Sequence, residues 1–319
     1  MPSRSKVAIA FAALYIVWGS TYLAILYAIE TLPPLLMAGA RFITAGALLY
    51  GFLRAKGAAR PTAPQWKAAF IVGTLLLLGG NGGVVWAEQL VPSGIAALLV
   101  ASLPLWMVTL DALRPGGKRP TTGVLIGLVL GILGLVLLIG PAQLAGGGRV
   151  NPLGAAVLLL ASFLWALGSI YSRSAPAPSD PFLASAMQML AGGLALLVGG
   201  AVRGELATLD SFEPSTKSVL AFFYLIVFGS LIGFTAYIWL LRVSTPAKVA
   251  TYAYVNPVVA VLLGWGLADE PLTSRTLLAA AVIVGAVALI TTARSAKGEK
   301  RVTGERRVPD DIRRVSDPA

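Results

Sequence analysis

The chain of 319 residues is 57% hydrophobic and only 12% charged, which excludes a soluble globular protein and is typical of an integral membrane protein. Its net charge of +11 would suit a nucleic-acid partner, so the position of the basic residues has to decide between that partner and the membrane. The chain contains no histidine and no cysteine, which removes two common catalytic and metal-ligating side chains.

Ten apolar windows are long enough to cross a hydrocarbon layer about 30 Å thick as helices of about 20 residues. They lie at 7–27, 35–53, 68–87, 93–110, 121–139, 152–172, 182–201, 218–240, 247–267 and 273–292. Transmembrane β-strands alternate over about ten residues, so these windows do not fit a barrel. The first window follows basic residues as a signal peptide does, but the nine further windows and the lack of a small-residue cleavage site predict that it is retained. We therefore expect an all-α polytopic membrane protein with ten transmembrane helices.

The basic residues follow the loops of this predicted topology. If the N-terminus is inside, twenty of the 25 Lys and Arg residues lie in inner segments, four lie in outer segments and Arg41 lies within a helix. This bias satisfies the positive-inside rule with both termini in the cytoplasm. The charge therefore indicates orientation and contact with anionic lipid, so the bilayer is the expected partner and nucleic acid is not needed.

The second half of the sequence repeats the first. At shifts of 147 or 151 residues the matched pairs include Trp18 with Trp165, Pro34 with Pro181, Pro120 with Pro271 and Gly134 with Gly285. Each copy holds five helices, an odd number, so the second copy must cross the membrane in the opposite direction, as in many secondary transporters. We expect a first repeat at 1–140, a Gly-rich linker at 141–151, an inverted repeat at 152–292 and a basic, disordered cytoplasmic tail at 293–319.

The first three helices carry unusual residues at depth. Trp18 lies about eleven residues into the first helix, roughly 17 Å deep, and Tyr22 shares its face. A tryptophan at that depth is not a surface anchor, so it either lines a cavity or packs between helices. In the third helix Gly79–Gly83, which includes Asn81, allows a close backbone approach or a local break.

Arg41 in the second helix is the only charge clearly within a span, roughly 10 Å from the outer side. Insertion of such a charge costs up to about 3 kcal/mol, so Arg41 should face the interior and find a partner. A substrate carboxylate is one candidate, and Glu30, Glu88 or unpaired backbone carbonyls are the others. The shift of 147 pairs Arg41 with another polar residue, Gln188.

The sixth and eighth helices also carry candidates. Trp165 matches Trp18 in depth and has the same two interpretations, cavity wall or helix packing. Ser230, Phe234 and Tyr237 share one face of the eighth helix.

Prolines interrupt the fourth and ninth helices, at Pro104 and Pro257. Along the ninth, Lys248, Tyr252 and Asn256 recur every four residues and form one polar stripe. Lys248 lies near the cytoplasmic end, where its long side chain can snorkel to the interface. Tyr252 and Asn256 lie deeper and are the better cavity candidates.

The fifth and tenth helices carry small residues and no polar residue at mid-depth. The small residues are Gly123, Gly127, Gly131, Gly134, Ala280, Ala281 and Gly285. Such faces let helices pack closely, so these two helices are predicted to be scaffold or oligomer contacts. The sequence therefore allows a homodimer through the fifth and tenth helices.

Several of these residues together carry a family resemblance. They are Trp18–Tyr22, Arg41–Phe42 after the Pro pair, Ala87–Ala97 leading to Pro104, Trp165, Pro257 and Glu270–Leu272. Over about residues 7–292 the chain resembles the EamA-type transporters of the drug/metabolite superfamily. This resemblance implies two inverted five-helix repeats, a pathway between helices one to four and six to nine, and export of amino acids or other small metabolites across the bacterial inner membrane. The pathway positions that it implies are Trp18, Tyr22, Arg41, Asn81, Trp165, Tyr237, Tyr252 and Asn256.

We therefore expect a secondary transporter for small neutral or amphipathic metabolites, above all aromatic or apolar amino acids. It would work by alternating access and facilitated diffusion, without cofactor or metal. An enzyme is disfavoured because no catalytic constellation, deep carboxylate or metal-ligand cluster is present. One alternative is a proton-coupled antiporter, in which water in a cavity would reach Glu88. A channel or a membrane scaffold is the remaining alternative.

Overall fold

The structure is a computed structural model that describes residues 3–91, 96, 99–115, 117, 119–139, 151–211, 213–267 and 273–293. Within these ranges the chain is helical and contains no strand. The expected disordered tail and nearly all of the expected Gly-rich linker lie outside the described residues.

The helices of the first half follow the five predicted spans. They are α1 (Arg4–Ile29), α2 (Pro34–Ala55), α3 (Ala63–Gly73), η1 (Thr74–Gly82), α4 (Gly83–Ala87), α6 (Leu103–Leu113) and α7 (Thr122–Ile139). The third span is one continuous helix made of α3, η1 and α4, in which η1 is wound as a π-helix. The predicted fourth span at 93–110 begins partly outside the described residues, and its described part is α6.

The second half repeats this order. Its elements are α9 (Pro152–Ser172), α10 (Pro181–Val202), the 3₁₀ turn η2 (Glu205–Ser211), α11 (Thr216–Tyr224), η3 (Leu225–Phe234), α12 (Thr235–Val243), α13 (Pro246–Val249), α14 (Tyr252–Leu267) and α15 (Ser274–Ala293). The π-helix η3 lies within the eighth span as η1 lies within the third. The ninth span is broken at Ala250–Thr251, between α13 and α14. Among the described residues, six helices are long and apolar enough to cross a membrane unaided, and α6, α7 and α15 are shorter apolar helices.

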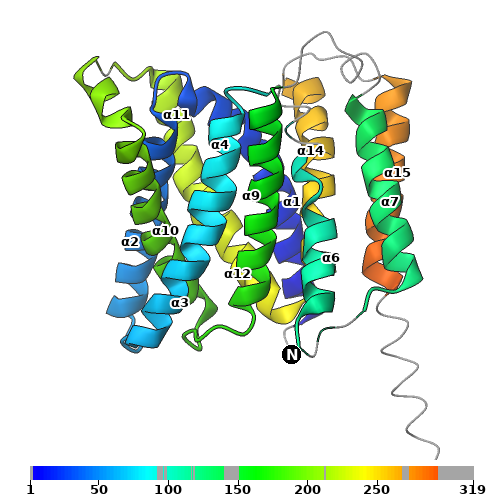
Figure 1. The fold of residues 1–319 in the computed structure, drawn as a ribbon, viewed down its shortest axis with the longest axis horizontal. Helices are drawn as coiled ribbons and strands as arrows, with labels where there is room; N and C mark the ends of the chain where they lie inside the picture. Colours follow the sequence, from blue (N-terminus) through cyan, green and yellow to red (C-terminus); the bar gives the residue numbers. More distant parts are fainter. Residues whose placement is uncertain are drawn as a thin grey trace, which may run out of the picture.

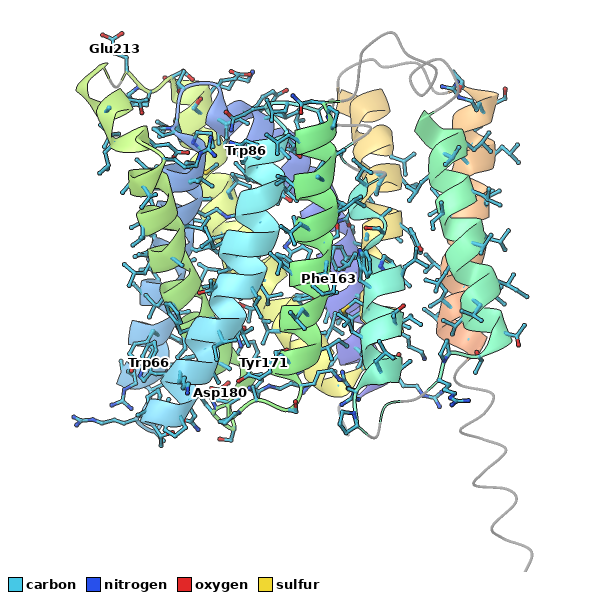
Figure 2. All side chains as sticks on the ribbon, viewed as in Figure 1. Trp66, Trp86, Phe163, Tyr171, Asp180 and Glu213 are labelled. Atoms are coloured by element: carbon cyan, nitrogen blue, oxygen red, sulfur yellow. The ribbon has the colours of Figure 1, made fainter. Side chains whose placement is uncertain are left out.

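The two halves run in opposite directions through the molecule (Figure 1). We call the side on which α1 begins the N-terminal side, and the other the far side. Trp66, Tyr171 and Asp180 lie on the N-terminal side, whereas Trp86 and Glu213 lie on the far side (Figure 2). Thus α1 starts on the N-terminal side, while α9, its counterpart in the second half, ends there at Tyr171. The predicted fold class, a ten-helix polytopic protein with two inverted repeats, is confirmed.

The halves interlock through their first helices. α1 packs against η3, α12 and α14 of the second half, and α9 packs against η1, α4 and α6 of the first. Two further close pairs, α2 with α10 and α7 with α15, join equivalent helices of the two halves. This exchange places the interior of the bundle between the halves, where residues from both sequences meet.

Helix starts are fixed by polar side chains. Asn151 accepts hydrogen bonds from the first free backbone N–H groups of α9, and Asp180 caps α10 in the same way. The N-terminus of α2 is capped from a distance, because Glu205 accepts from the backbone N–H groups of Leu35 and Leu36 at 2.9 Å each. This carboxylate ties the loop after α10 to the start of α2 on the far side.

Glycines of α7 pack against isoleucines of α15, whereas a Cβ on Gly285 of α15 would meet nothing within 4 Å. A Cβ on Gly127 would lie 2.6 Å from Ile290, and one on Gly134 would lie 2.7 Å from Ile283. The close packing predicted for these helices is therefore used within the chain. A homodimer through the fifth and tenth helices would have to use their remaining apolar faces, where Val129, among others, is exposed.

Candidate functional site

One cavity lies between the halves and takes residues from both. Its empty volume is about 710 Å³, a figure that includes open space outside the cavity. Its polar and aromatic lining residues are Trp18, Thr21, Arg41, Phe42, Asn81, Ser162, Trp165, Phe234, Tyr252 and Asn256. On α1 the lining continues from Trp18 through Thr21 to Ile25, toward the far side, so the cavity lies in the far half of the bundle.

Six of the eight predicted pathway residues line this cavity. They are Trp18, Arg41, Asn81, Trp165, Tyr252 and Asn256. Tyr237 lies behind the wall and is fully buried. Tyr22 lies on α1, but its side chain is outside the described part of the chain. That these residues contact a substrate stays a prediction.

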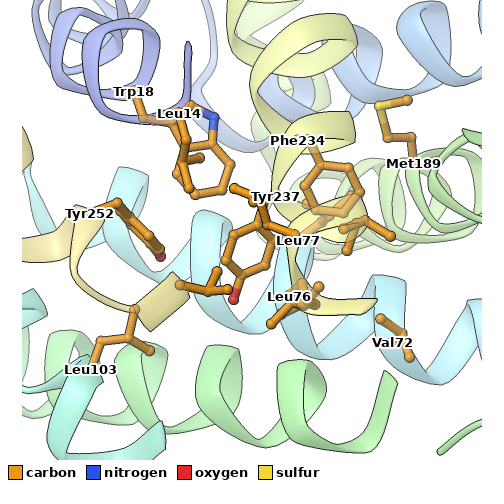
Figure 3. Packing of buried hydrophobic residues seen from close by; sticks show 14 of the residues in the cluster. Leu14, Trp18, Val72, Leu76, Leu77, Leu103, Met189, Phe234, Tyr237 and Tyr252 are labelled. Carbon is orange, nitrogen blue, oxygen red and sulfur yellow. The ribbon is translucent and has the colours of Figure 1, made fainter. Parts of the chain in front are cut away.

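Four aromatic rings, those of Trp18, Trp165, Tyr237 and Tyr252, pack together at the end of the cavity nearer the N-terminal side. Figure 3 shows three of them, Trp18, Tyr237 and Tyr252. The Trp18 ring centroid lies 5.6 Å from that of Trp165, 5.2 Å from that of Tyr237 and 4.8 Å from that of Tyr252. Tyr237 in turn contacts Trp165 and Tyr252 at 5.5 and 5.7 Å. These separations suit edge-to-face packing, so the four rings, which we call the aromatic floor, form a single packed unit.

Hydrogen bonds fix the rings of the aromatic floor. Trp165 Nε1 donates to Tyr237 Oη at 2.8 Å, and the Ser169 hydroxyl lies 2.5 Å from the same oxygen. Trp18 Nε1 donates to the backbone carbonyl of Gly229 in η3 at 3.1 Å. Both indoles are therefore held in place by groups of the second half, so the floor depends on the fit between the halves.

Glycines in the π-helices let the two tryptophans approach. A Cβ on Gly80 of η1 would lie 2.5 Å from Trp165 Cε3, and one on Gly233 of η3 would lie 2.3 Å from Trp18 Nε1. Each tryptophan thus packs on the π-helix of the opposite half. π-helical turns are rare and frequently occur at functional sites, so their presence in both halves makes this region the candidate site.

Arg41 is buried, with 4% of its surface exposed. Its Nε donates to Ser230 Oγ at 2.8 Å, whereas its Nη1 has no hydrogen-bond partner. Glu30 instead pairs with Lys217 at 2.7 Å on the protein surface. Among the residues that the structure describes, no carboxylate pairs with Arg41, so of the proposed protein carboxylates neither Glu30 nor Glu88 fills that role. Its predicted counterpart Gln188 does not line the cavity.

The two asparagines of the cavity, Asn81 and Asn256, differ in the hydrogen bonds that their side-chain amides form. Asn81 lines the cavity, and its Oδ1 is buried without a partner. Asn256, oriented by its hydrogen bonds, donates from its amide nitrogen to the carbonyls of Tyr252 at 3.0 Å and Tyr15 at 3.3 Å. Asn256 therefore joins α14 to α1, and Asn81 is the asparagine whose oxygen is left for a ligand.

Sequence reasoning missed several lining residues. Ser162 was not singled out, although it lies one helical turn before Trp165, and Phe42 was named only for the family resemblance and not as a pathway residue. The π-helices were missed as well. Their signal was the match of Gly82 with Gly233 at the same shift of 151 that relates the fifth and tenth helices.

Comparison with known proteins shows which family this chain belongs to. Residues 5–140 and 152–292 each match the EamA-like transporter family. The chain belongs to this family. Among its relatives, the EamA-type protein described as "Uncharacterized inner membrane transporter YedA" of Escherichia coli (strain K12) is 44% identical over 283 residues, covering 88% of this chain and 89% of YedA. The "Probable amino-acid metabolite efflux pump" of the same strain is 26% identical over 296 residues, covering 84% of this chain and 89% of the pump.

A solved structure shares the EamA-type fold with a TM-score of 0.72 and 24% identity, and the match covers 91% of this chain and 98% of that chain. At this identity the likeness shows the fold alone. We conclude that this chain is a multi-pass inner-membrane transporter and not an enzyme. The conclusion rests on its family, its apolar helices and its likeness to an inner membrane transporter.

Proposed function

We propose that this transporter exports small amphipathic metabolites, above all amino acids with aromatic or apolar side chains. The observation that carries this proposal is the aromatic floor, in which Trp18 and Trp165 from the two halves meet at one cavity. Flat indole faces suit an apolar side chain, and the polar atoms of Arg41 and Asn81 suit a polar head. The name of the 26% identical relative, an amino-acid metabolite efflux pump, favours the same class.

We further propose that transport occurs by alternating access, with 1–140 and 152–292 as the repeats that rock against each other. The cavity lies in the far half, and its lining on α1 and α9 ends toward the N-terminal side at Trp18 and Trp165 of the aromatic floor. With cytoplasmic termini, as the distribution of basic residues favours, this arrangement corresponds to a state that faces outward.

The orientation predicts opposite labelling of two exposed alanines. Ala59 lies in the loop before α3 on the N-terminal side, and Ala207 lies in η2 on the far side. The chain has no natural cysteine, so Ala59→Cys and Ala207→Cys each introduce a single thiol. We expect an impermeant maleimide to label Ala207→Cys in intact cells and Ala59→Cys only after permeabilisation. The reverse order would contradict cytoplasmic termini, and the parent chain serves as the unlabelled control.

The transport proposal is tested by flux into liposomes that contain the purified chain. We expect saturable uptake of phenylalanine or tryptophan and accelerated counterflow against preloaded amino acid, because a carrier must rebind its substrate on each side. A channel would show neither behaviour. We also expect that a pH gradient alone does not make the amino acid accumulate in the liposomes. Proton-coupled carriers commonly use a membrane-embedded carboxylate or histidine, and this sequence has no histidine and no carboxylate deep within a predicted span.

Glu88 gives the proton-coupled alternative a specific basis. It follows the last residue of the third span, its Oε2 is buried without a partner, and burial raises the pKa of its carboxyl to about 7. Because the raised pKa lies near neutrality, Glu88 would bind a proton below about pH 7 and release it above. Accumulation driven by an imposed pH gradient and abolished in Glu88→Gln would replace facilitated diffusion with proton antiport.

A further inference from the structure

We infer that Arg41 and Asn81 form the head-group site of this cavity, in which Arg41 Nη1 binds a carboxylate and Asn81 Oδ1 accepts from an ammonium group. This inference rests on the proposed export of amino acids and says which atoms hold them. Two observations point to it independently. The cavity lining contains a buried donor without a partner on Arg41 and a buried acceptor without a partner on Asn81.

The guanidinium is positioned by the π-helix of the other half. Ser230 holds Nε at 2.8 Å, and Gly229 leaves room beside Nη2, because a Cβ on this glycine would lie 3.2 Å from that nitrogen. The guanidinium carbon also lies 4.4 Å from the centroid of the Phe42 ring. These contacts hold the plane of the guanidinium through Nε, and among the described residues no group accepts a hydrogen bond from Nη1, which is buried.

A carboxylate is the group that matches this donor. A buried cation requires a counter-charge, and among the described residues none of the carboxylates forms an ion pair with Arg41. The bond from an arginine N–H to a carboxylate is charge-assisted and stronger than one to a neutral acceptor. The missing counter-ion would thus arrive with the transported molecule.

The acceptor on Asn81 matches the ammonium group of an amino acid. α2, which carries Arg41, packs against η1, which carries Asn81, so the two residues lie on neighbouring elements of one cavity wall. An amide oxygen accepts hydrogen bonds, and an ammonium group offers three donors. A free donor that is cationic and a free acceptor together match a zwitterion, with the side chain of the amino acid directed to the aromatic floor.

The test compares three ligands that differ only in the head group: phenylalanine, phenylalanine amide and 3-phenylpropionate. The first has both charged groups, the second lacks the carboxylate and the third lacks the ammonium. Binding to the purified full-length chain is measured by calorimetry. We expect the wild-type chain to bind phenylalanine at least about tenfold more tightly than either analogue, since each analogue leaves one buried polar atom unpaired.

The variants assign each preference to one residue. Arg41→Gln should bring the affinities for phenylalanine and its amide to within about twofold while the preference over 3-phenylpropionate remains. Asn81→Leu should remove the preference for phenylalanine over 3-phenylpropionate and keep the preference for phenylalanine over its amide. Arg41→Lys, which keeps the charge, is the variant to use if Arg41→Gln does not fold, and it should retain part of the preference over the amide.

Gln188→Leu is the matched control. Gln188 is buried in α10, the helix equivalent to α2, and its Oε1 also lacks a partner, but it does not line the cavity. We expect all three affinities to be unchanged in this variant. If Arg41→Gln weakens phenylalanine and its amide by the same factor, Arg41 acts only on the structure and the inference is wrong.

A failure of the proposed function can be told from a failure of this site. If the wild-type chain binds none of the three ligands, the proposed amino-acid class is wrong, and benzoate and benzamide then test the anion site by itself. Binding of benzoate that is lost in Arg41→Gln would keep Arg41 as an anion site. If the wild-type chain binds benzoate no more tightly than benzamide, Arg41 is not an anion site and the inference is overturned.

Discussion

Trp165→Ala is expected to abolish saturable amino-acid transport or to raise its KM at least about tenfold. Trp165 lines the cavity, contacts the rings of Trp18 and Tyr237, and donates to the Tyr237 hydroxyl at 2.8 Å. Its removal deletes one wall of the aromatic floor and leaves Tyr237 with one partner fewer. Uptake into liposomes, normalised to the amount of folded protein, measures the effect.

Loss of fold has to be separated from loss of the site. Truncation of a buried tryptophan to alanine costs about 3–5 kcal/mol, so expression and monodispersity are measured alongside transport. Trp106→Ala is the matched control, because Trp106 packs on Phe163 at 5.4 Å but does not line the cavity. If Trp165→Ala and Trp18→Ala both transport aromatic amino acids normally, the proposed site is wrong even though the fold is right.

Gly233→Ala is expected to block the conformation described here. The added methyl group would lie 2.3 Å from Trp18 Nε1 and 2.6 Å from Cδ1, and this indole is already bonded to the carbonyl of Gly229. One of the two must move, so the floor cannot close as it does in the wild-type chain. We expect a transport rate at least about tenfold lower, because a carrier must visit each of its states in every cycle.

Gly51→Ala is the control for this substitution. Gly51 lies in α2, and a Cβ there would meet nothing within 4 Å. Alanine is favoured over glycine within a helix by about 1 kcal/mol, so Gly51→Ala should leave transport unchanged and raise thermal stability. A transport rate for Gly233→Ala equal to that of Gly51→Ala would show that the contact between Gly233 and Trp18 does not matter for the cycle.

Sequence reasoning predicted the helices and six of the ten polar and aromatic residues that line the cavity, because both leave a pattern in the sequence. Long apolar windows define spans, and the shift of 147 residues that pairs Trp18 with Trp165 marked two tryptophans that the structure brings together. The partner of Arg41 was out of reach, because Ser230 lies 189 residues away, in η3, which packs against α2. No local pattern specifies which element faces a buried charge.

The position of Tyr237 shows a second limit. Ser230, Phe234 and Tyr237 share a face only if the helix keeps the α-helical period. The stretch up to Phe234 is π-helical, with bonds from residue i to i+5, so the face rotates along the chain. Phe234, the last residue of η3, lines the cavity, whereas Tyr237 belongs to the α-helical α12 and lies behind it.

The interlock of the first helices also has a consequence for biogenesis. The bond from Trp18 to Gly229 spans 211 residues, and the contact of Tyr15 with Thr251 spans 236. At about 5–20 residues per second, the ribosome takes roughly 10–50 seconds to reach these partners after α1 has been made. During that interval α1 is in the membrane without the neighbours that cover its cavity face. The first half therefore has to wait in the bilayer, shielded by lipid or by the insertion machinery, until the eighth and ninth spans are synthesised.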